Sequence, residues 1–228
     1  FTMLEAYQSW GDQKSIAELT QRIILAVADE LGTRQVTVGE HLIDLDGDWR
    51  WLSVYPAVSE AAGVEITVDT PLSELSGIAA QHDIEVDPKW TDGKLVLELF
   101  EALVEPSLIQ PTFVCDYPAV AQPLARRRTD EPRLIEAWDL IIGGMERGTG
   151  FTEMIDPVIQ REVLTEQSLL AAAGDPEAMQ LDTDFIEALE YGVPPMGGLG
   201  IGIDRVIMLL TGSGIRETIL YPLLRPSQ

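Results

Sequence analysis

Gly197-Gly198-Leu199-Gly200-Ile201-Gly202-Ile203-Asp204-Arg205-Val206-Ile207-Met208-Leu209-Leu210 is the stretch that decides the fold. It opens as a strand with four glycines in six residues, and glycine inside a strand marks a close approach by a ligand or another backbone. Asp204 is predicted to cap a buried helix ending at Thr211-Gly212. Arg205, in its first turn, gains nothing from the helix dipole, so an anion such as a phosphate is its natural partner. Tight packing is the alternative, because the spacing fits neither dinucleotide-binding nor P-loop patterns.

The composition is that of an acidic, soluble globular protein. Apolar residues make up 46% and charged residues 23% of the 228 positions, and the net charge is −23. That charge excludes a broad nucleic-acid surface, so any RNA contact must be local. The lone Cys115 excludes an internal disulfide, and no membrane span or signal peptide is apparent, which predicts a cytoplasmic protein. The chain opens on Phe1 rather than Met, so we expect the natural N-terminus to lie elsewhere.

Hydrophobic periodicity predicts the elements of the first half of the chain. Residues 1–7 read as a strand with Phe1, Met3, Glu5 and Tyr7 on one face, where a carboxylate between aromatics is unusual for pure core. A hydrogen-bonded structural Glu5 is the alternative. Residues 12–31 read as a packing helix. Residues 41–45 and 49–55 read as a hairpin around a strong Asp-Gly turn signal, with tryptophans that pack rather than bind a ligand.

Residues 59–105 read as a peripheral helical insertion. Its predicted helices run from Pro71 to His82 and over residues 94–104, and its many acidic side chains form a solvated face to which we assign no chemistry. His41 and His82 have no partner at metal-ligand spacing, so a metal–histidine site is not expected.

Residues 138–154 read as a hairpin with a Gly-Gly turn, and this is the second informative region. The hairpin brings Asp139 close to Glu146, and two neighbouring carboxylates repel unless a cation lies between them. With oxygen ligands only and phosphates nearby, Mg²⁺ is the fitting ion, whereas two solvent-facing acids are the alternative. Thr149, Phe151 and Glu153 share one face of the second strand.

Three further features surround this hairpin. Residues 110–118 form a predicted apolar strand bounded by prolines. The basic cluster Arg126-Arg127-Arg128 invites a phosphate or RNA interpretation, although a solvated loop is favoured. Asp156-Pro157 is an N-cap followed by a first-turn proline and opens a helix to about Ala173, while residues 183–191 form another helix closed by glycine.

Several segments resemble the catalytic domain of class II lysyl-tRNA synthetases, over essentially the whole chain. The glycine-rich stretch resembles motif 3 of class II synthetases, and residues 1–7 resemble the second half of motif 2. Shorter matches point to the lysyl branch: Ile109-Gln110-Pro111-Thr112-Phe113, Pro123-Leu124-Ala125-Arg126, Gly143-Gly144-Met145-Glu146, Gly150-Phe151-Thr152-Glu153, Asp156-Pro157, Pro194-Pro195-Met196-Gly197-Gly198 and Ile215-Arg216-Glu217-Thr218. Motif 3 alone indicates class II, and the combination is far more specific.

The resemblance implies an α/β fold of the α+β type, with a mainly antiparallel sheet flanked by helices. It implies one catalytic domain over residues 1–228, incomplete at its N-terminus, with Mg²⁺ and with ATP as a substrate. The positions that match the family's ATP site are Phe1 (stacking on adenine), Asp139, Glu146, Gly198, Gly200, Gly202 and the catalytic Arg205. Asp139 and Glu146 match the Mg²⁺ carboxylates. The positions that match its lysine pocket are Glu5, Tyr7, Thr149, Phe151 and Glu153.

The reaction that the resemblance implies is activation of lysine. The lysine carboxylate attacks the ATP α-phosphorus, giving lysyl-adenylate and pyrophosphate, and the lysyl group then passes to the 3′ end of tRNA(Lys). The implied partners are lysine, ATP, the tRNA acceptor end and a second copy of the chain in a homodimer. Two alternatives remain: a ligase that attaches lysine to a protein such as elongation factor P, and an inactive paralogue that acts as a binding module.

Three departures from the family pattern bear on these expectations. Thr149 stands where most of the family has Asn, and together with Gly174-Asp175-Pro176-Glu177-Ala178-Met179 it resembles the synthetase domain fused to a phosphatidylglycerol lysyltransferase in some bacteria. That likeness raises a lipid-linked pathway. Asp139 replaces a usual Glu, so its reach is shorter by one methylene. Motif 1, the motif 2 Arg that contacts the α-phosphate and the anticodon-binding domain are absent from this sequence, which puts activity of the chain alone in doubt.

Overall fold

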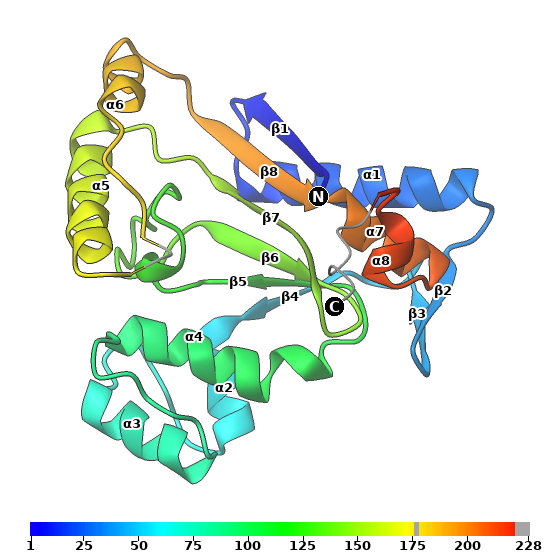
Figure 1. Cartoon of the computed structure of the whole chain (residues 1–228), viewed down its shortest axis with the longest axis horizontal. Coiled ribbons are helices and arrows are strands. Elements are labelled where there is room, and N and C mark those ends of the chain that lie inside the picture. Colours follow the sequence, from blue (N-terminus) through cyan, green and yellow to red (C-terminus); the bar gives the residue numbers. More distant parts are fainter. Residues whose placement is uncertain (176–177, 222–228) are drawn as a thin grey trace, which may run out of the picture.

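The computed structural model describes residues 1–175 and 178–221 and is built on a six-stranded sheet in the order β1-β8-β7-β6-β5-β4 (Figure 1). The strands are β1 (Met3–Ser9), β4 (Arg50–Ser53), β5 (Thr112–Cys115), β6 (Ala137–Ile141), β7 (Glu146–Thr152) and β8 (Met196–Gly202). Every neighbouring pair is antiparallel except β4 and β5. The predicted α+β fold with a mainly antiparallel sheet is therefore confirmed.

One face of the sheet is covered by α1 (Gln13–Glu30) and α7 (Ile203–Thr211). Helix α1 begins directly after Asp12, because the Asp12 side chain accepts hydrogen bonds from backbone amides of the first turn. The core on this face is centred on Trp138, which is fully buried. A Cβ at Gly150 would lie 2.4 Å from the Trp138 ring, so only glycine fits beneath that indole.

The opposite face is covered at only one end. The stretch predicted to be a helical insertion forms α2 (Val54–Ala62), α3 (Leu72–Gln81), α4 (Asp92–Leu103) and the short 3₁₀ helix η1 (Glu105–Ser107), between β4 and β5. Its apolar residues pack with Val114, Ala137 and Ile141 of β5 and β6 into a second core. In Figure 1 these helices lie beside the β4–β5 end, away from β1 and β8. Strands β1, β8 and β7 therefore present a largely bare face.

The hairpin predicted over residues 41–55 is wrong. β3 (His41–Asp44) pairs with β2 (Gln35–Val38), and the turn between them uses Gly39, whose φ is 59°. β4 instead joins the main sheet parallel to β5, with Arg50 opposite Thr112. The Asp-Gly signal marks a turn that connects two sheets, because Trp49 packs into the α1-side core rather than across a local hairpin.

The prediction that Asp204 caps helix α7 is also wrong. The capping position is Gly202, which makes no side-chain hydrogen bond, and Asp204 lies in the first turn, buried. Its Oδ2 accepts a hydrogen bond from the Thr2 amide at 2.7 Å. Asp204 therefore ties the start of β1 to α7, which fixes the opening segment beside the glycine strand.

The remaining elements lie at the two ends of the sheet. Helix α5 (Pro157–Ala172) is capped by Asp156 as predicted, and it packs on α6 (Thr183–Glu190). The chain also forms η2 (Ala119–Ala121) and α8 (Ile215–Thr218). Residues 176 and 177 of the lipid-synthesis resemblance lie outside the described residues. Among the helices described, none has the length and apolar character needed to cross a bilayer.

Candidate active site

The sheet register brings the predicted site residues onto its bare face. In one row across the strands, Glu5 lies opposite Gly200, Gly200 opposite Thr149, and Thr149 opposite Asp139. The next row aligns Tyr7, Gly198 and Phe151. Since side chains alternate between faces along a strand, residues directly opposite one another share a face. Segments from the two ends and the middle of the chain therefore meet here.

Glycines of β8 form the floor of this face. A Cβ at Gly198 would lie 2.0 Å from Oε1 of Glu153 and 2.9 Å from the Tyr7 ring, so a larger residue would displace both side chains. A Cβ at Gly200 would lie 3.3 Å from the Met3 methyl group. The missing side chains leave room between β1 and β7 for the groups that flank them. Gly198, predicted to contact ATP, thus lies among the residues predicted to bind lysine.

Glu153 is a buried acidic residue that forms no ion pair with any described residue. Its Oε1 is buried and has no hydrogen-bond partner within residues 1–175 and 178–221, and burial raises the pKa of the carboxyl to about 7. Tyr7 Oη donates to Glu5 Oε2 at 3.4 Å. Partial burial and the nearby charges of Glu5 and Glu153 raise the pKa of Tyr7. The three groups therefore lie together on the bare face of the sheet, and their negative charge is suited to a cationic ligand.

Asp139 of β6 and Glu146 of β7 lie close together beyond these residues. Burial and the charge of Glu146 raise the pKa of Asp139 to about 6, against hydrogen bonds from Thr149 and Tyr117. These oxygen donors fit Mg²⁺, which is commonly held by one or two carboxylates together with substrate phosphates. No group of three or more metal-ligating side chains occurs in residues 1–175 and 178–221. A Mg²⁺ ion held by two carboxylates and substrate phosphates needs no such group.

Arg205 adjoins this carboxylate pair. Its Nη1 donates to the backbone oxygen of Glu146 at 3.1 Å and lies 3.3 Å from Glu146 Oε1. The side chain is 45% exposed and can therefore reach a ligand. This face thus has an acidic end at Glu5 and Glu153, and a mixed end where the Arg205 guanidinium lies beside the Glu146 carboxylate.

Phe1, predicted to stack on adenine, lies outside the strand rows described above. It is fully exposed and precedes β1, which begins at Met3. Sequence reasoning in turn missed Tyr117, a buried residue whose hydroxyl bonds Asp139. It also missed Arg147, which is 2% exposed and whose pKa is lowered to about 10 by burial and by Arg205. No local signal marks Arg147, because β7 also carries Glu146, Thr149 and Thr152 and has Phe151 as its one large apolar side chain.

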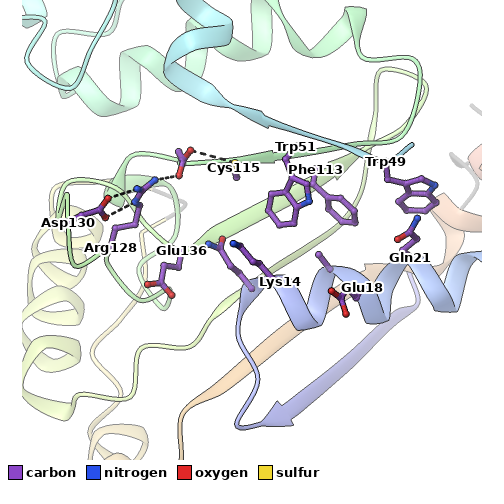
Figure 2. Close-up of a pocket in the computed structure, with 13 residues that line it drawn as sticks. Lys14, Glu18, Gln21, Trp49, Trp51, Phe113, Cys115, Arg128, Asp130 and Glu136 are labelled. Carbon is purple, nitrogen blue, oxygen red and sulfur yellow. Dashed lines mark hydrogen bonds and ion pairs between the residues drawn. The ribbon is translucent and has the colours of Figure 1, made fainter. Parts of the chain in front are cut away.

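A separate cavity of about 690 Å³ opens on the opposite face, between α1 and the β4–β5 edge (Figure 2). Lys14 and Glu18 of α1 face Trp51 and Phe113, whose rings stack at 5.2 Å. None of the predicted site residues lines it. The expected packing role holds for the buried Trp49, whereas Trp51 is 43% exposed at this cavity.

The basic cluster beside this cavity is largely neutralised within the chain. Arg126 forms an ion pair with Glu136, and Arg128 is paired with Asp116 and Asp130 (Figure 2). Guanidinium groups already engaged by carboxylates offer little to a phosphate backbone. The contacts therefore favour the local structural interpretation over RNA binding.

Comparison with known proteins gives the class to which this fold and site belong. The family model described as "tRNA synthetases class II (D, K and N)" matches residues 1–225, and the chain belongs to this family. Within it, the chain is 50% identical over 229 residues to the lysine–tRNA ligase of Kineococcus radiotolerans, covering 99% of this chain and 46% of that protein. It is 47% identical over 234 residues to the lysine–tRNA ligase of Mycobacterium tuberculosis, with the same coverage.

A bifunctional protein is also similar. The chain is 47% identical over 233 residues to the lysylphosphatidylglycerol biosynthesis bifunctional protein LysX of Gordonia bronchialis, covering all of this chain and 20% of that protein. The chain therefore spans about half the length of the ligases it matches and a fifth of the bifunctional protein. The predicted lysyl branch of class II is confirmed.

Proposed function

We propose that this chain is the part of a lysine–tRNA ligase that binds lysine and ATP and forms lysyl-adenylate. The observation that carries the proposal is the buried, unpartnered carboxylate of Glu153, facing Glu5 and Tyr7 across a glycine floor. A sheet face whose acidic end has no cation from the described residues, and whose other end holds an exposed arginine, matches a ligand with ammonium groups joined to a phosphate-bearing partner. The relatives' names support lysine as that ligand.

We assign lysine to one end of the site and ATP with Mg²⁺ to the other. Glu5, Tyr7 and Glu153 receive the ammonium groups of lysine, and Thr149 and Phe151 line the space between β1 and the middle of the sheet. Arg205, with Gly200 and Gly202 beside it, binds the ATP phosphates, and Asp139 and Glu146 hold Mg²⁺, which supplies positive charge to the phosphates. Gly198 is the floor on which lysine rests.

The proposed reaction needs no covalent bond to the protein. A lysine carboxylate oxygen bonds to the α-phosphorus of ATP as the bond to pyrophosphate breaks, in line. The chain contributes orientation of the two substrates and charge stabilisation by Arg205. The lysyl group then passes to the tRNA acceptor end, and we propose that the natural protein acts as a homodimer. The acidic surface fits a contact with tRNA that is local.

Lysine-dependent exchange of pyrophosphate into ATP tests this function in the natural polypeptide that contains these residues. We expect exchange that requires lysine and Mg²⁺ and is absent with ornithine or arginine. Calorimetry should show binding of lysine and of ATP. A folded protein that binds neither ligand contradicts the proposal, and exchange with another amino acid contradicts the choice of lysine.

The acceptor of the lysyl group is a second question. The second candidate function is formation of lysyl-tRNA that supplies lipid lysylation. The match to LysX over the whole chain favours it, since the same activation of lysine precedes protein synthesis and lipid lysylation. Charging assays with tRNA(Lys), elongation factor P and no acceptor distinguish the alternatives. We expect lysine on tRNA alone, and lysine on the protein instead would overturn this assignment.

A further inference from the structure

Arg147 is a buried cation without a matching anion. It is 2% exposed, and none of the described carboxylates forms an ion pair with it. Its Nε donates to the Ile142 backbone oxygen at 3.0 Å, and its Nη1 donates to the Arg205 backbone oxygen at 2.9 Å and to the Met145 sulfur at 3.3 Å. Taking a charge out of water without a counter-charge is costly in free energy. The burial of Arg147 therefore indicates a role other than stabilising the fold.

A β-bulge explains how the side chain reaches the helix. Glu146 lies opposite Ile141 and Gly148 lies opposite Leu140, so Arg147 is an extra residue in β7. Bulges redirect side chains and are frequent beside functional sites. Here the bulge lets consecutive residues act on the same neighbour, Arg205.

Glu146 and Arg147 together hold Arg205 at both ends. Glu146 contacts its guanidinium through a backbone oxygen at 3.1 Å and a carboxylate oxygen at 3.3 Å. Arg147 holds its backbone oxygen, at the first turn of α7. The two guanidinium groups are also close enough to repel each other. The repulsion raises the positive potential at the exposed end of Arg205, where an anion would offset both charges.

We propose that Arg147 is a positioning residue that orients Arg205 and strengthens its attraction for the phosphates of a nucleotide. The proposal rests on the proposed function, because it concerns the phosphate end of the same site. It differs from a packing role in one respect. A packing residue would affect both substrates through the fold, whereas Arg147 acts on ATP and leaves unchanged the lysine end, which lies farther along the chain at Glu153 and across β8 at Glu5 and Tyr7.

Two substitutions test the proposal in the natural polypeptide. Arg147→Met keeps the length of the side chain but removes the charge and the donors, and Arg147→Lys keeps the charge without the planar fork. Arg161→Met removes an equal charge from an exposed ion pair on α5 and is the matched control. Calorimetry gives Kd for ATP and for lysine, and thermal unfolding monitors the fold.

We expect Arg147→Met to raise Kd for ATP about tenfold, the scale seen when a residue that supports a binding group is lost. Arg147→Lys should raise it less, about threefold. Kd for lysine should stay at the wild-type value, and the control should match wild type for both ligands. If the Met variant unfolds, the Lys variant decides the outcome.

Unchanged ATP affinity in a folded variant overturns the proposal, and so does an equal loss of lysine affinity. A wild-type protein that binds no ATP overturns the proposed function as well, so the two failures are distinguishable.

Discussion

Replacing Glu153 by Gln should make the protein more stable and less able to bind lysine. The carboxyl lies beside Gly198, its Oε1 is buried without a partner among the described residues, and its pKa is raised to about 7 by burial. A residue kept for stability would not hold an unpaired charge. A residue kept for binding would, because the ligand supplies the missing cation.

The sign of the stability effect follows from the pKa. Between pH 4.5 and about 7 the native carboxyl keeps a proton that the unfolded chain has released, so the wild type loses stability as the pH rises through this range. Above pH 7 the loss is complete. Screening by solvent reduces it to about 1–2 kcal/mol for this partly buried group. Glu153→Gln cannot ionise, so it should be more stable than wild type by that amount at pH 8 and equal to it at pH 4.

The binding effect has the opposite direction. Loss of a desolvated charge pair costs about 2–4 kcal/mol, which is about 30- to 1,000-fold in Kd for lysine. Wild-type affinity should also fall about tenfold per pH unit below 7, because lysine must bind the ionised carboxylate. The variant should show no such dependence from this group.

Urea denaturation at pH 4 and pH 8 and calorimetry with lysine measure both effects. Glu162→Gln, an exposed change on α5, is the matched control and should leave both quantities unchanged. A Glu153→Gln variant that is less stable than wild type at pH 8, or that binds lysine with wild-type affinity, would refute the reasoning.

Three further predictions rest on close contacts and burial. Gly198→Ala places a Cβ 2.0 Å from Glu153 Oε1, so lysine affinity measured by calorimetry should fall at least about tenfold while ATP affinity is retained; equal loss for both ligands would contradict this. Gly150→Ala places a Cβ 2.4 Å from the Trp138 ring, so the free energy of unfolding in urea should fall by about 2–3 kcal/mol, and an unchanged midpoint would refute the packing argument. Burial raises the pKa of the Cys115 thiol to about 12, so iodoacetamide at pH 8 should modify it at least about 100-fold faster in unfolded than in native protein; equal rates would count against it.

Local patterns predicted the elements whose cause is local. The start of α5 at Asp156-Pro157 follows from capping, and the glycine-rich strand β8 follows from the backbone preferences of glycine. Both elements are present. The hairpin over residues 41–55 failed because the partner of β4 is β5, which follows a helical insertion. Arg50 pairs with Thr112, and no local turn signal can report a contact across that distance.

In the candidate site, too, the sequence predicts some residues and misses those whose role depends on strand pairing. Matching residues to the family pattern found both carboxylates that face the glycine floor, but not Tyr117 or Arg147. Their roles depend on register: Tyr117 follows β5 and reaches Asp139, and Arg147 is the extra residue of a bulge. A bulge changes which face a side chain occupies, so strict alternation cannot locate it in a sequence.

The two faces of β8 explain why fold and site depend on the same stretch. Leu199 and Ile201 face α1 and α7 and are buried in their core. Gly198 and Gly200 alternate with them on the opposite face, which carries the candidate site. The apolar residues hold the strand in the middle of the three-stranded floor, and the glycines keep that floor free of side chains. A substitution on the first face should therefore be detected as lost stability, and one on the second as lost affinity. Measuring both for Leu199→Ala and Gly198→Ala separates these contributions within one strand: we expect the first to lower the unfolding free energy by about 2–4 kcal/mol. If Leu199→Ala instead weakens lysine binding with stability intact, the division of β8 into a packing face and a binding face is wrong.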